Sequence, residues 1–320
     1  MSTTDISIII ATRHREEILW TSVEKACLAT EDRNAEIIII NDGDSPLNIP
    51  GSFTHKIYCF DNPKRGVSSA RNFGVSKANG RVLFFVDDDM WINREIIDWI
   101  NINVAGKNKT EAVYFIDWEY PPYLKAKLAK SKIGRYLLCT NYHTLWGRLH
   151  KTFPKPVSGL YKYDSVGSGS LVMHKEIFIK TGGYNENIIF QGEDAEMAGK
   201  LNDLHVPIYI VFDITLYHNH SDRLEIKNFL RRSYDGFGSE FKAVNAGEVR
   251  PASHTNYNRL EKVLLEFSRI TEKGWISLLK LLPNYGVVTP LSNKLIGALG
   301  GLQKYKQWRN INSSLKIPAQ

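Results

Sequence analysis

The sequence has few cysteines and lacks any hydrophobic run long enough to cross a membrane. Its three cysteines, Cys27, Cys59 and Cys139, are odd in number, widely spaced and never arranged as a metal-type pair. A disulfide framework or a zinc site is therefore not expected. Because a membrane-spanning helix needs about 20 consecutive apolar residues, we do not expect an integral membrane protein. The small, unpaired set of cysteines favours a reducing, cytoplasmic setting.

The sequence also lacks the pattern of a secretory signal. Residues 1–5 are polar and lead directly into a strand-like run, so we expect no signal peptide. The formal net charge is +7, yet no nucleic-acid-binding motif accompanies it, and we expect no nucleic-acid partner. The 320 residues, 43% of them hydrophobic, suffice for one large domain or for a domain with an appendage.

Acidic residues are missing from the C-terminal end. Residues 221–320 contain 16 Lys and Arg against 8 Asp and Glu, and residues 274–320 contain six basic residues and no acidic one. Apolar residues recur there at helical spacing around Lys294 and Lys304, at Leu291, Leu295, Leu299, Leu302 and Tyr305. We expect a basic amphipathic helical region over 221–320. It either touches a membrane surface through residues 274–320 or packs its apolar side on the protein.

The first 120 residues alternate between strand and helix patterns. Five runs rich in isoleucine, valine and phenylalanine predict strands, at 6–11, 35–40, 56–60, 82–86 and 112–116. Three stretches with helical periodicity lie between them, at 16–29, 67–78 and 93–104. This alternation predicts an α/β fold, with a mostly parallel sheet flanked by helices and a Rossmann-like nucleotide-binding half.

Polar loops follow three of the predicted strands, at 12–15, 41–45 and 87–89. The third loop, Asp87 to Asp89, places three carboxylates directly after a continuous apolar run. Adjacent carboxylates repel one another unless a cation joins them, and ligands of parallel sheets bind beyond the carboxyl ends of the strands. The loop therefore predicts a divalent ion with a phosphorylated substrate, although a solvated acidic turn fits the same residues.

Two further segments carry polar groups suited to a nucleotide. Asp42 follows a strand of four isoleucines, where a carboxylate accepts hydrogen bonds from a ribose or a base, or else begins a turn. The segment 62–72 brings Lys64, Arg65 and Arg71 to a loop that opens a helix, a suitable place for a diphosphate. Arg71 fits equally well as a surface arginine.

These motifs, taken in order, resemble the family 2 glycosyltransferases. The resemblance covers residues 6–220 and rests on five elements: Asp42-Gly43, the segment 66–74 (GVSSARNFG), Asp87 to Asp89, the segment 182–186 (GGYNE) and the segment 192–194 (GED). It implies a single-domain GT-A fold over residues 1–220, with an aromatic insertion at 117–165 and the helical extension at 221–320.

The resemblance also implies the donor site. Nucleotide-binding roles fall on Thr12, Asp42, Arg71, Asp87 and Asp88, of which Asp88 is the variable middle position. Asp89 would hold Mn²⁺ or Mg²⁺ on the diphosphate. His218 would complete the metal site, with His220 as a weaker choice, although a histidine after an apolar strand is often only a surface residue.

Catalysis is assigned to Asp194 by the same resemblance. As general base it would take the proton of an acceptor hydroxyl that attacks the anomeric carbon, which inverts the configuration. Glu193 is the rival for this role. The acids at 193–196 would also serve merely to begin a helix, because negative charge there interacts favourably with the helix dipole.

The acceptor side is less defined. Residues 117–165 hold many aromatic side chains, which suit stacking on a sugar or a lipid-linked acceptor or form an aromatic core under a loop. The family's usual arginine after the acidic pair is Lys200 here, and the glutamine-x-x-arginine-tryptophan signature of polymer synthases is missing. We therefore expect transfer of one hexosyl or N-acetylhexosaminyl unit, from a UDP-sugar by default.

The resemblance places such transfer in bacterial surface glycan assembly, on lipopolysaccharide, capsule, glycolipid or peptide acceptors, at the inner face of the cell membrane. Two other classes remain open. One is a nucleotide-sugar-binding protein without catalysis that acts through its basic C-terminal surface. The other is a metal-dependent nucleotidyltransferase or phosphohydrolase, which would use the same carboxylates at a phosphorus centre.

Overall fold

The computed structural model describes residues 4–53, 57–106, 111–150, 156–189, 192–221, 225–245, 257–282 and 289–315. The chain forms two compact units. The first contains Met1–Pro121, Thr144–Trp146 and Thr152–Asn219, and the second contains Pro122–His143, Gly147–Lys151 and His220–Gln320. The chain passes between the units close to the predicted boundary at 220, but residues 122–143 belong with the C-terminal helices.

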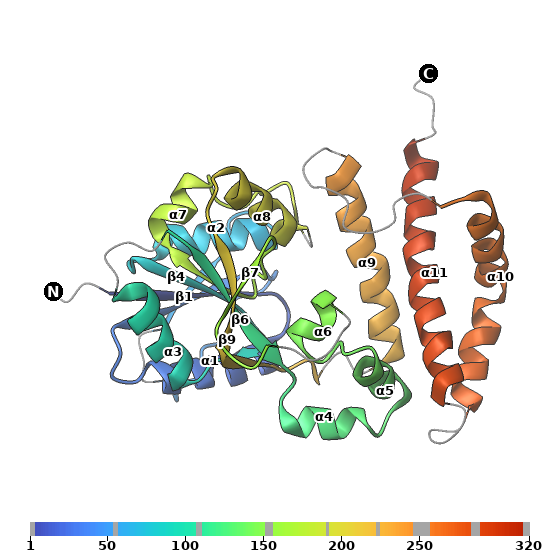
Figure 1. Ribbon diagram of the computed structural model, residues 1–320, viewed down its shortest axis with the longest axis horizontal. Coiled ribbons are helices and arrows are strands. Elements are labelled where there is room, and N and C mark those ends of the chain that lie inside the picture. The colour runs from blue at the N-terminus through green and yellow to red at the C-terminus, as the bar shows by residue number, and fades with distance from the viewer. Residues whose placement is uncertain are drawn as a thin grey trace. The chain divides into compact units, whose positions relative to one another are not determined.

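The first unit is built on one sheet of nine strands in the order β3-β2-β1-β4-β8-β6-β9-β5, with β7 paired to β9 (Figure 1). The strands are β1 (Ile6–Thr12), β2 (Ala35–Asn41), β3 (Ile57–Asp61), β4 (Val82–Asp87), β5 (Met90–Trp91), β6 (Val113–Glu119), β7 (Leu160–Tyr163), β8 (Ser170–His174) and β9 (Ile208–His218). All five predicted strands are present. β3, β2, β1 and β4 run parallel, as predicted, whereas β8 is antiparallel to β4 and the rest of the sheet is mixed.

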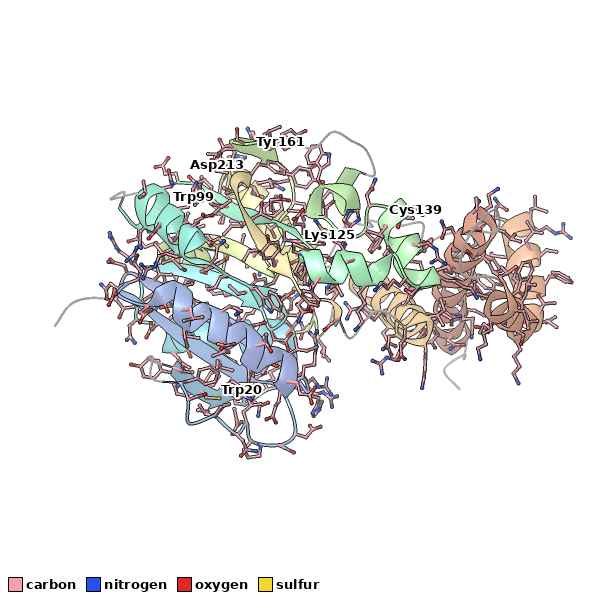
Figure 2. All side chains as sticks on the ribbon, turned by 90° about the horizontal axis from the view of Figure 1, so that it is seen from below. Trp20, Trp99, Lys125, Cys139, Tyr161 and Asp213 are labelled. Atoms are coloured by element: carbon pink, nitrogen blue, oxygen red, sulfur yellow. The ribbon has the colours of Figure 1, made fainter. Side chains whose placement is uncertain are left out.

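Helices cover both faces of this sheet (Figure 1). α1 (Glu16–Thr30) and α3 (Arg94–Ile100) lie on one face, and α2 (Val67–Lys77), α7 (Lys175–Lys180) and α8 (Glu193–Asp203) lie on the other. A π-helical turn, Asn101–Ala105, follows α3, and α6 (Leu145–His150) lies later in the chain. Trp99 of α3, which is labelled in Figure 2, meets Tyr114 of β6 edge-on, with ring centroids 5.5 Å apart.

Burial on both faces explains the composition of the central strands. The four isoleucines of β2 and the two phenylalanines of β4 are fully buried. A sheet covered on both sides has no solvated face, so its strands are continuous apolar runs rather than alternating ones. Polar residues are therefore found mainly at the ends of these strands, where the polar loops 12–15, 41–45 and 87–89 begin.

The second unit is helical. It contains α4 (Pro122–Leu128), α5 (Lys132–Cys139), α9 (Ile226–Asn245), α10 (Arg259–Leu281) and α11 (Thr289–Leu315). α11 packs against α9, α10 and α5. Of the apolar residues predicted for α11, Leu291 is exposed, and the others are buried: Leu295, Leu299, Leu302 and Tyr305. The predicted periodicity is present, but most of it serves internal packing and is not available to a membrane surface.

Candidate functional site

The carboxyl ends of β1, β2 and β4 lie side by side at one edge of the sheet. Thr12 of β1 is in register with Asn41 of β2, and Ala11 is in register with Asp87 of β4. The backbone N–H of Asp42 donates to the Thr12 carbonyl oxygen at 2.8 Å. Because parallel strands end together, the three polar loops that follow them converge on one place, as the sequence predicted.

Two of the three consecutive aspartates are buried, and an arginine compensates their charge. Asp88 is 5% exposed and Asp89 is fully buried. The Arg15 guanidinium bridges them, with Nη1 at 2.5 Å from Asp88 Oδ1 and Nη2 at 2.8 Å from Asp89 Oδ2. Thr12 Oγ1 also donates to Asp88 at 2.7 Å. Burial raises the pKa of Asp88 to about 7, although Arg15 lowers it.

Sequence reasoning missed Arg15. The residue lies in the polar loop that was predicted after β1, but it meets the acidic loop across more than 70 residues of sequence. Only the parallel pairing of β1 with β4 brings the two loops together. The one signal in the sequence was that Arg15 is a cation in a loop expected to lie near the three carboxylates Asp87 to Asp89.

Asp89 also faces the end of β9. Its Oδ1 lies 3.0 Å from His218 Nε2, and Met90 is in register with His218. Asp89, His218 and His220, the last only two residues further along, offer three ligand atoms within 4.8 Å of one another, and all three side chains are buried. One carboxylate oxygen with two imidazole nitrogens is a donor set that suits Mn²⁺, whereas Mg²⁺ prefers oxygen alone. The residues therefore fit a transition-metal ion.

The ring of His218 is held from the side as well. Trp118 of β6 meets it edge-on, with ring centroids 4.6 Å apart. The backbone N–H of Asn219 donates to the Asp89 carbonyl oxygen at 2.7 Å. These contacts fix the orientation of the imidazole relative to Asp89, and such orientation matters for a metal ligand.

A second network joins the acidic loop to α8. Arg71 of α2 is buried, with Nη2 at 3.0 Å from Asp87 Oδ1 and Nη1 at 3.0 Å from Glu193 Oε1. Burial acts to lower the pKa of Arg71, but Tyr184, Glu193 and Asp87 raise it overall. Burial and the nearby Asp194 raise the pKa of Glu193. Arg71 is therefore not a surface arginine, and it holds two carboxylates in fixed positions.

Asp194 is placed differently from its neighbour. It lies in the first turn of α8, which begins after Gly192 at a positive φ of 106°. The backbone N–H of Ser168 donates to Asp194 Oδ1 at 2.8 Å, and no salt bridge to Asp194 is found in the described part of the chain. Lys200, which stands where the family usually has an arginine, contacts Glu196 and the Gly183 carbonyl instead.

The loop before β8 comes very close to the acidic triplet. A Cβ atom added to Gly169 would clash with the Asp87 carboxylate, because it would lie closer to Oδ2 than real Cβ atoms come to non-bonded neighbours. The Asp87 N–H donates to the Gly169 carbonyl oxygen at 3.1 Å. A larger residue at 169 would therefore require the Asp87 carboxylate or the loop to shift.

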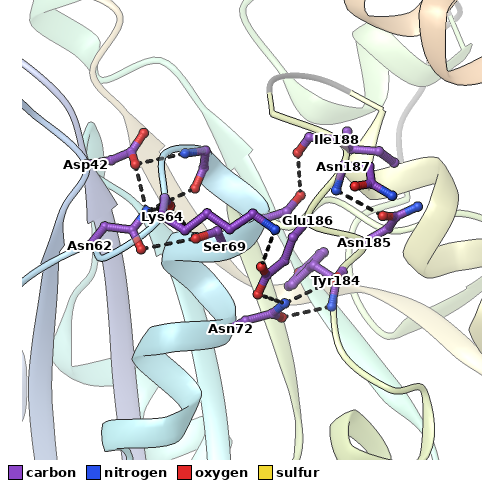
Figure 3. Close-up of polar contacts among 12 residues, drawn as sticks. Asp42, Asn62, Lys64, Ser69, Asn72, Tyr184, Asn185, Glu186, Asn187 and Ile188 are labelled. Carbon is purple, nitrogen blue, oxygen red and sulfur yellow. Dashed lines mark hydrogen bonds and ion pairs between the residues drawn. The ribbon is translucent and has the colours of Figure 1, made fainter.

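Asp42 belongs to a third network, between β2 and the start of α2 (Figure 3). Its Oδ1 accepts from Asn62 Nδ2 at 2.7 Å and from the Gly66 N–H at 2.9 Å. Asn72 of α2 extends the network to the segment 182–186 through Tyr184 and Glu186 (Figure 3). The motif at 66–74 is thus in contact with the motif at 182–186.

The aromatic segment 117–165 does not form one surface. Trp118 and Tyr120 are buried, whereas Tyr123, Tyr142 and Tyr161 are at least 40% exposed. Its residues are divided between the two units, and residues 151–155 lie outside the described part of the chain. An acceptor role for the segment stays a prediction.

A parallel half-sheet with acidic loops at its carboxyl edge, continued by a mixed half, defines the GT-A fold. A solved mannosyltransferase from Pyrobaculum calidifontis, in complex with GDP-Man and Mn²⁺, has this fold. The two chains superpose with a TM-score of 0.55 at 11% sequence identity. The superposition covers 94% of this chain and 86% of the mannosyltransferase. At that identity the likeness shows the fold alone.

Residues 7–100 match the model of glycosyl transferase family 2. Two curated relatives are the glycosyltransferase GlyA of Streptococcus pneumoniae, 30% identical over 98 residues, and the UDP-Glc:alpha-D-GlcNAc-diphosphoundecaprenol beta-1,3-glucosyltransferase WfaP of Escherichia coli, 33% identical over 115 residues. The alignments cover 29% and 34% of this chain but only 14% of GlyA and 43% of WfaP. The match confirms, for residues 7–100, the resemblance to family 2 of the glycosyltransferases that is seen in the sequence.

A helix that crosses a membrane must be about 20 residues long and predominantly apolar. Among the described helices, none combines the necessary length with sufficient hydropathy.

Proposed function

We propose that this protein is an inverting, metal-dependent glycosyltransferase, which moves one sugar from a nucleotide-diphosphate sugar to an acceptor hydroxyl. The observation that carries the proposal is the acidic end of β4, where Asp89 lies beside His218 at the carboxyl edge of a family 2 domain. A carboxylate and an imidazole side by side at this edge suit a metal-bound diphosphate better than a solvated acidic turn, because Asp89 is fully buried.

The donor diphosphate is assigned to Asp89 and His218. A bound Mn²⁺ ion would neutralise the charge that develops on the departing nucleoside diphosphate. Asp89 presents Oδ1 toward His218, while Arg15 holds its other oxygen. Arg15 therefore orients the carboxylate and leaves one oxygen facing the imidazole.

The nucleoside is assigned to Thr12, Asp42, Arg71, Asp87 and Asp88. Asp42 is fixed through Oδ1 by Asn62 and Gly66, which leaves Oδ2 for a ligand hydroxyl or a base. UDP is the proposed nucleotide, supported by the donor in the name of WfaP, whereas the mannosyltransferase of the same fold was solved with GDP-Man.

Asp194 is proposed as the general base. A base must present a free carboxylate oxygen to the acceptor hydroxyl, and its own position must be fixed. The Ser168 N–H fixes one oxygen of Asp194, whereas Glu193 is committed to the buried Arg71 at 3.0 Å. Glu193 therefore fits the role of a neighbour that anchors the start of α8.

The acceptor is proposed to be a bacterial surface glycan or a glycolipid, with a hexosyl or N-acetylhexosaminyl unit as the sugar transferred. WfaP, by its name, acts on a diphosphoundecaprenol-linked sugar, which supports a lipid-linked acceptor. A location at the inner face of the cell membrane follows from this choice of acceptor.

Calorimetric titration tests the donor site. The purified protein is titrated with UDP, GDP, CDP and dTDP, each with and without Mn²⁺. We expect binding of one nucleotide that depends on the metal, and Asp89→Ala should weaken it. Binding of none of the four would contradict the proposal.

A product assay separates the transferase from a phosphohydrolase. With the matching nucleotide sugar and a lipid-linked acceptor, a transferase releases the nucleoside diphosphate and extends the acceptor. Release of the nucleoside monophosphate instead would identify attack at phosphorus and overturn the proposed reaction.

A further inference from the structure

The outer side of α10 is apolar and exposed to solvent. Asn258 begins the helix with a capping box, in which its side chain accepts from the Glu261 N–H and the Glu261 side chain accepts from the Asn258 N–H. Eight large apolar side chains along the helix are between 37% and 82% exposed: Leu260, Val263, Leu264, Phe267, Ile270, Trp275, Leu278 and Leu281. We name this set the α10 stripe.

The stripe follows one side of the helix. Apart from the adjacent pair Val263 and Leu264 and one step of five residues, its members follow one another at intervals of three residues, and that spacing keeps them on a single side. The opposite side packs inside the second unit, where Leu279 is 5% exposed and α10 contacts α11. With a rise of about 1.5 Å per residue, the stripe is about 30 Å long. An exposed apolar surface that continues over this length indicates an interaction site.

The acidic residues of α10 are already used within the protein. Glu261 caps the helix, and Glu272 bonds to Gln303 and Lys306 of α11. Glu266 accepts from the Tyr305 hydroxyl at 2.9 Å and pairs with Arg269 at 2.8 Å. Each glutamate is held by partners of its own unit, so none is left to neutralise an outside cation.

The basic residues that border the stripe are available. Arg259, Lys273 and Lys280 are exposed, and no ion pair to any of them is found in the described part of the chain. The region 221–320 as a whole has 16 basic and 8 acidic residues. The surface therefore combines an apolar stripe with unpaired positive charge.

We propose that the α10 stripe lies in the headgroup layer of an anionic lipid bilayer. A lipid surface with negative headgroups takes up both the apolar side chains and the flanking lysines. A second copy of this chain is the alternative occupant, but it would bring the same unpaired cations to the same contact, and like charges oppose such pairing. Trp275, which lies on the border of the stripe, is a residue type that concentrates at membrane interfaces.

This inference goes beyond the proposed function and does not depend on it. It also assigns the lipid contact to a different surface from the one expected in the sequence. The apolar positions of α11 are mostly buried, whereas those of α10 face solvent.

Vesicle co-sedimentation of the full chain tests the proposal. Vesicles of phosphatidylcholine alone are compared with vesicles that also contain phosphatidylglycerol. We expect binding to the second kind only, weakened by added salt because the cations are exposed. Ile270→Glu should reduce binding by about tenfold or more, since it removes an apolar contact and adds a negative charge. Ile270 is 75% exposed, so the variant should fold normally, which circular dichroism checks.

Two matched variants serve as controls. Ile102, in the first unit, is 71% exposed, and Ile102→Glu should bind like the wild type. The double variant Lys273→Glu, Lys280→Glu should lose the preference for anionic vesicles, whereas Lys180→Glu on the exposed end of α7 should not.

Three outcomes would overturn the proposal. The first is no binding to anionic vesicles, and the second is equal binding by Ile270→Glu and the wild type. The third is a dimer in light scattering that Ile270→Glu dissociates while vesicles remain unbound, because the occupant of the stripe would then be a second copy of the chain.

Discussion

At the scale of single residues, the site is governed by how each carboxylate is neutralised. Asp88 and Asp89 share the Arg15 guanidinium, Asp87 shares Arg71 with Glu193, and Asp194 accepts from a backbone N–H. Adjacent buried carboxylates are stable only with such partners. Asp87, Asp88, Asp89 and Glu193 are thus paired with arginine, whereas Asp194 accepts a hydrogen bond from a neutral donor.

This separation predicts the effect of Asp194→Asn. The amide keeps the shape of the side chain but cannot take the proton from the acceptor hydroxyl. Turnover should therefore fall by about 10²–10⁴-fold. Donor affinity should stay within about twofold, because the residue does not contact the nucleotide in the proposed arrangement. Rates of nucleotide release give the first quantity and calorimetry the second. Wild-type turnover by Asp194→Asn would eliminate it as the base.

Glu193→Gln is the control for that prediction. It removes one of the two carboxylates that pair with the buried Arg71, and Asp87 remains. The free energy of unfolding should therefore fall by about 1–3 kcal/mol. Loss of turnover without loss of stability in Glu193→Gln, together with an active Asp194→Asn, would exchange the two roles.

A second residue-scale prediction concerns Arg15. Its guanidinium supplies positive charge to Asp88 and Asp89, which a divalent ion at Asp89 would supply in part. Arg15→Gln should therefore destabilise the metal-free protein by about 3 kcal/mol. Added Mn²⁺ should stabilise Arg15→Gln more than it stabilises the wild type. Thermal unfolding with and without Mn²⁺ measures both. An equal Mn²⁺-induced change in Tm for the two proteins would show that Arg15 does not share the ion's electrostatic role.

At the scale of elements, the sequence predicts the positions of the strands better than it predicts which strands pair. The runs at 6–11, 35–40 and 82–86 are strands because both sheet faces are buried, a pattern that local composition reveals. The antiparallel pairing of β8 with β4 has no such local signal, because it depends on a return of the chain from more than 80 residues away. The same distance hides Gly169, whose need for glycine comes only from Asp87.

That close approach predicts the outcome of Gly169→Ala. The new Cβ atom would clash with Asp87 Oδ2, so Asp87 or the loop must move. Overpacking of this kind costs about 1–3 kcal/mol, and donor affinity should fall as well. Chemical denaturation and nucleotide titration measure the two effects.

Gly167→Ala is the matched control in the same loop. Its Cβ atom would lie 3.5 Å from the Phe115 ring, an ordinary contact, so both stability and affinity should be nearly unchanged. Equal effects of the two substitutions would show that the loop as a whole, rather than the approach to Asp87, is sensitive.

At the scale of the whole molecule, the division into units could not be predicted from composition. The sequence predicted a domain over 1–220 with 117–165 as an insertion, and that boundary stays a prediction. The structure groups Pro122–His143 with the C-terminal helices. The aromatic and lysine residues in α4 and α5 are compatible with an acceptor surface or with helix packing. Only the contact of α5 with α11, which the sequence does not reveal, favours helix packing.

This grouping predicts that in a chain ending at residue 220, residues 122–143 will not adopt their native packing. Within the second unit, Tyr136 of α5 meets Phe229 of α9 edge-on at 5.5 Å, and Lys132 Nζ donates to the Leu279 carbonyl oxygen at 2.6 Å. Removal of α9, α10 and α11 takes away these partners and exposes the side of α5 that they cover. The truncated chain should bind a hydrophobic dye and be cleaved by protease within residues 122–143. A chain ending at 315, which keeps all described helices, should resemble the full chain in both assays. If the chain ending at 220 unfolded cooperatively without dye binding, the predicted boundary at 220 would stand, because the first 220 residues would then form an independent folding unit.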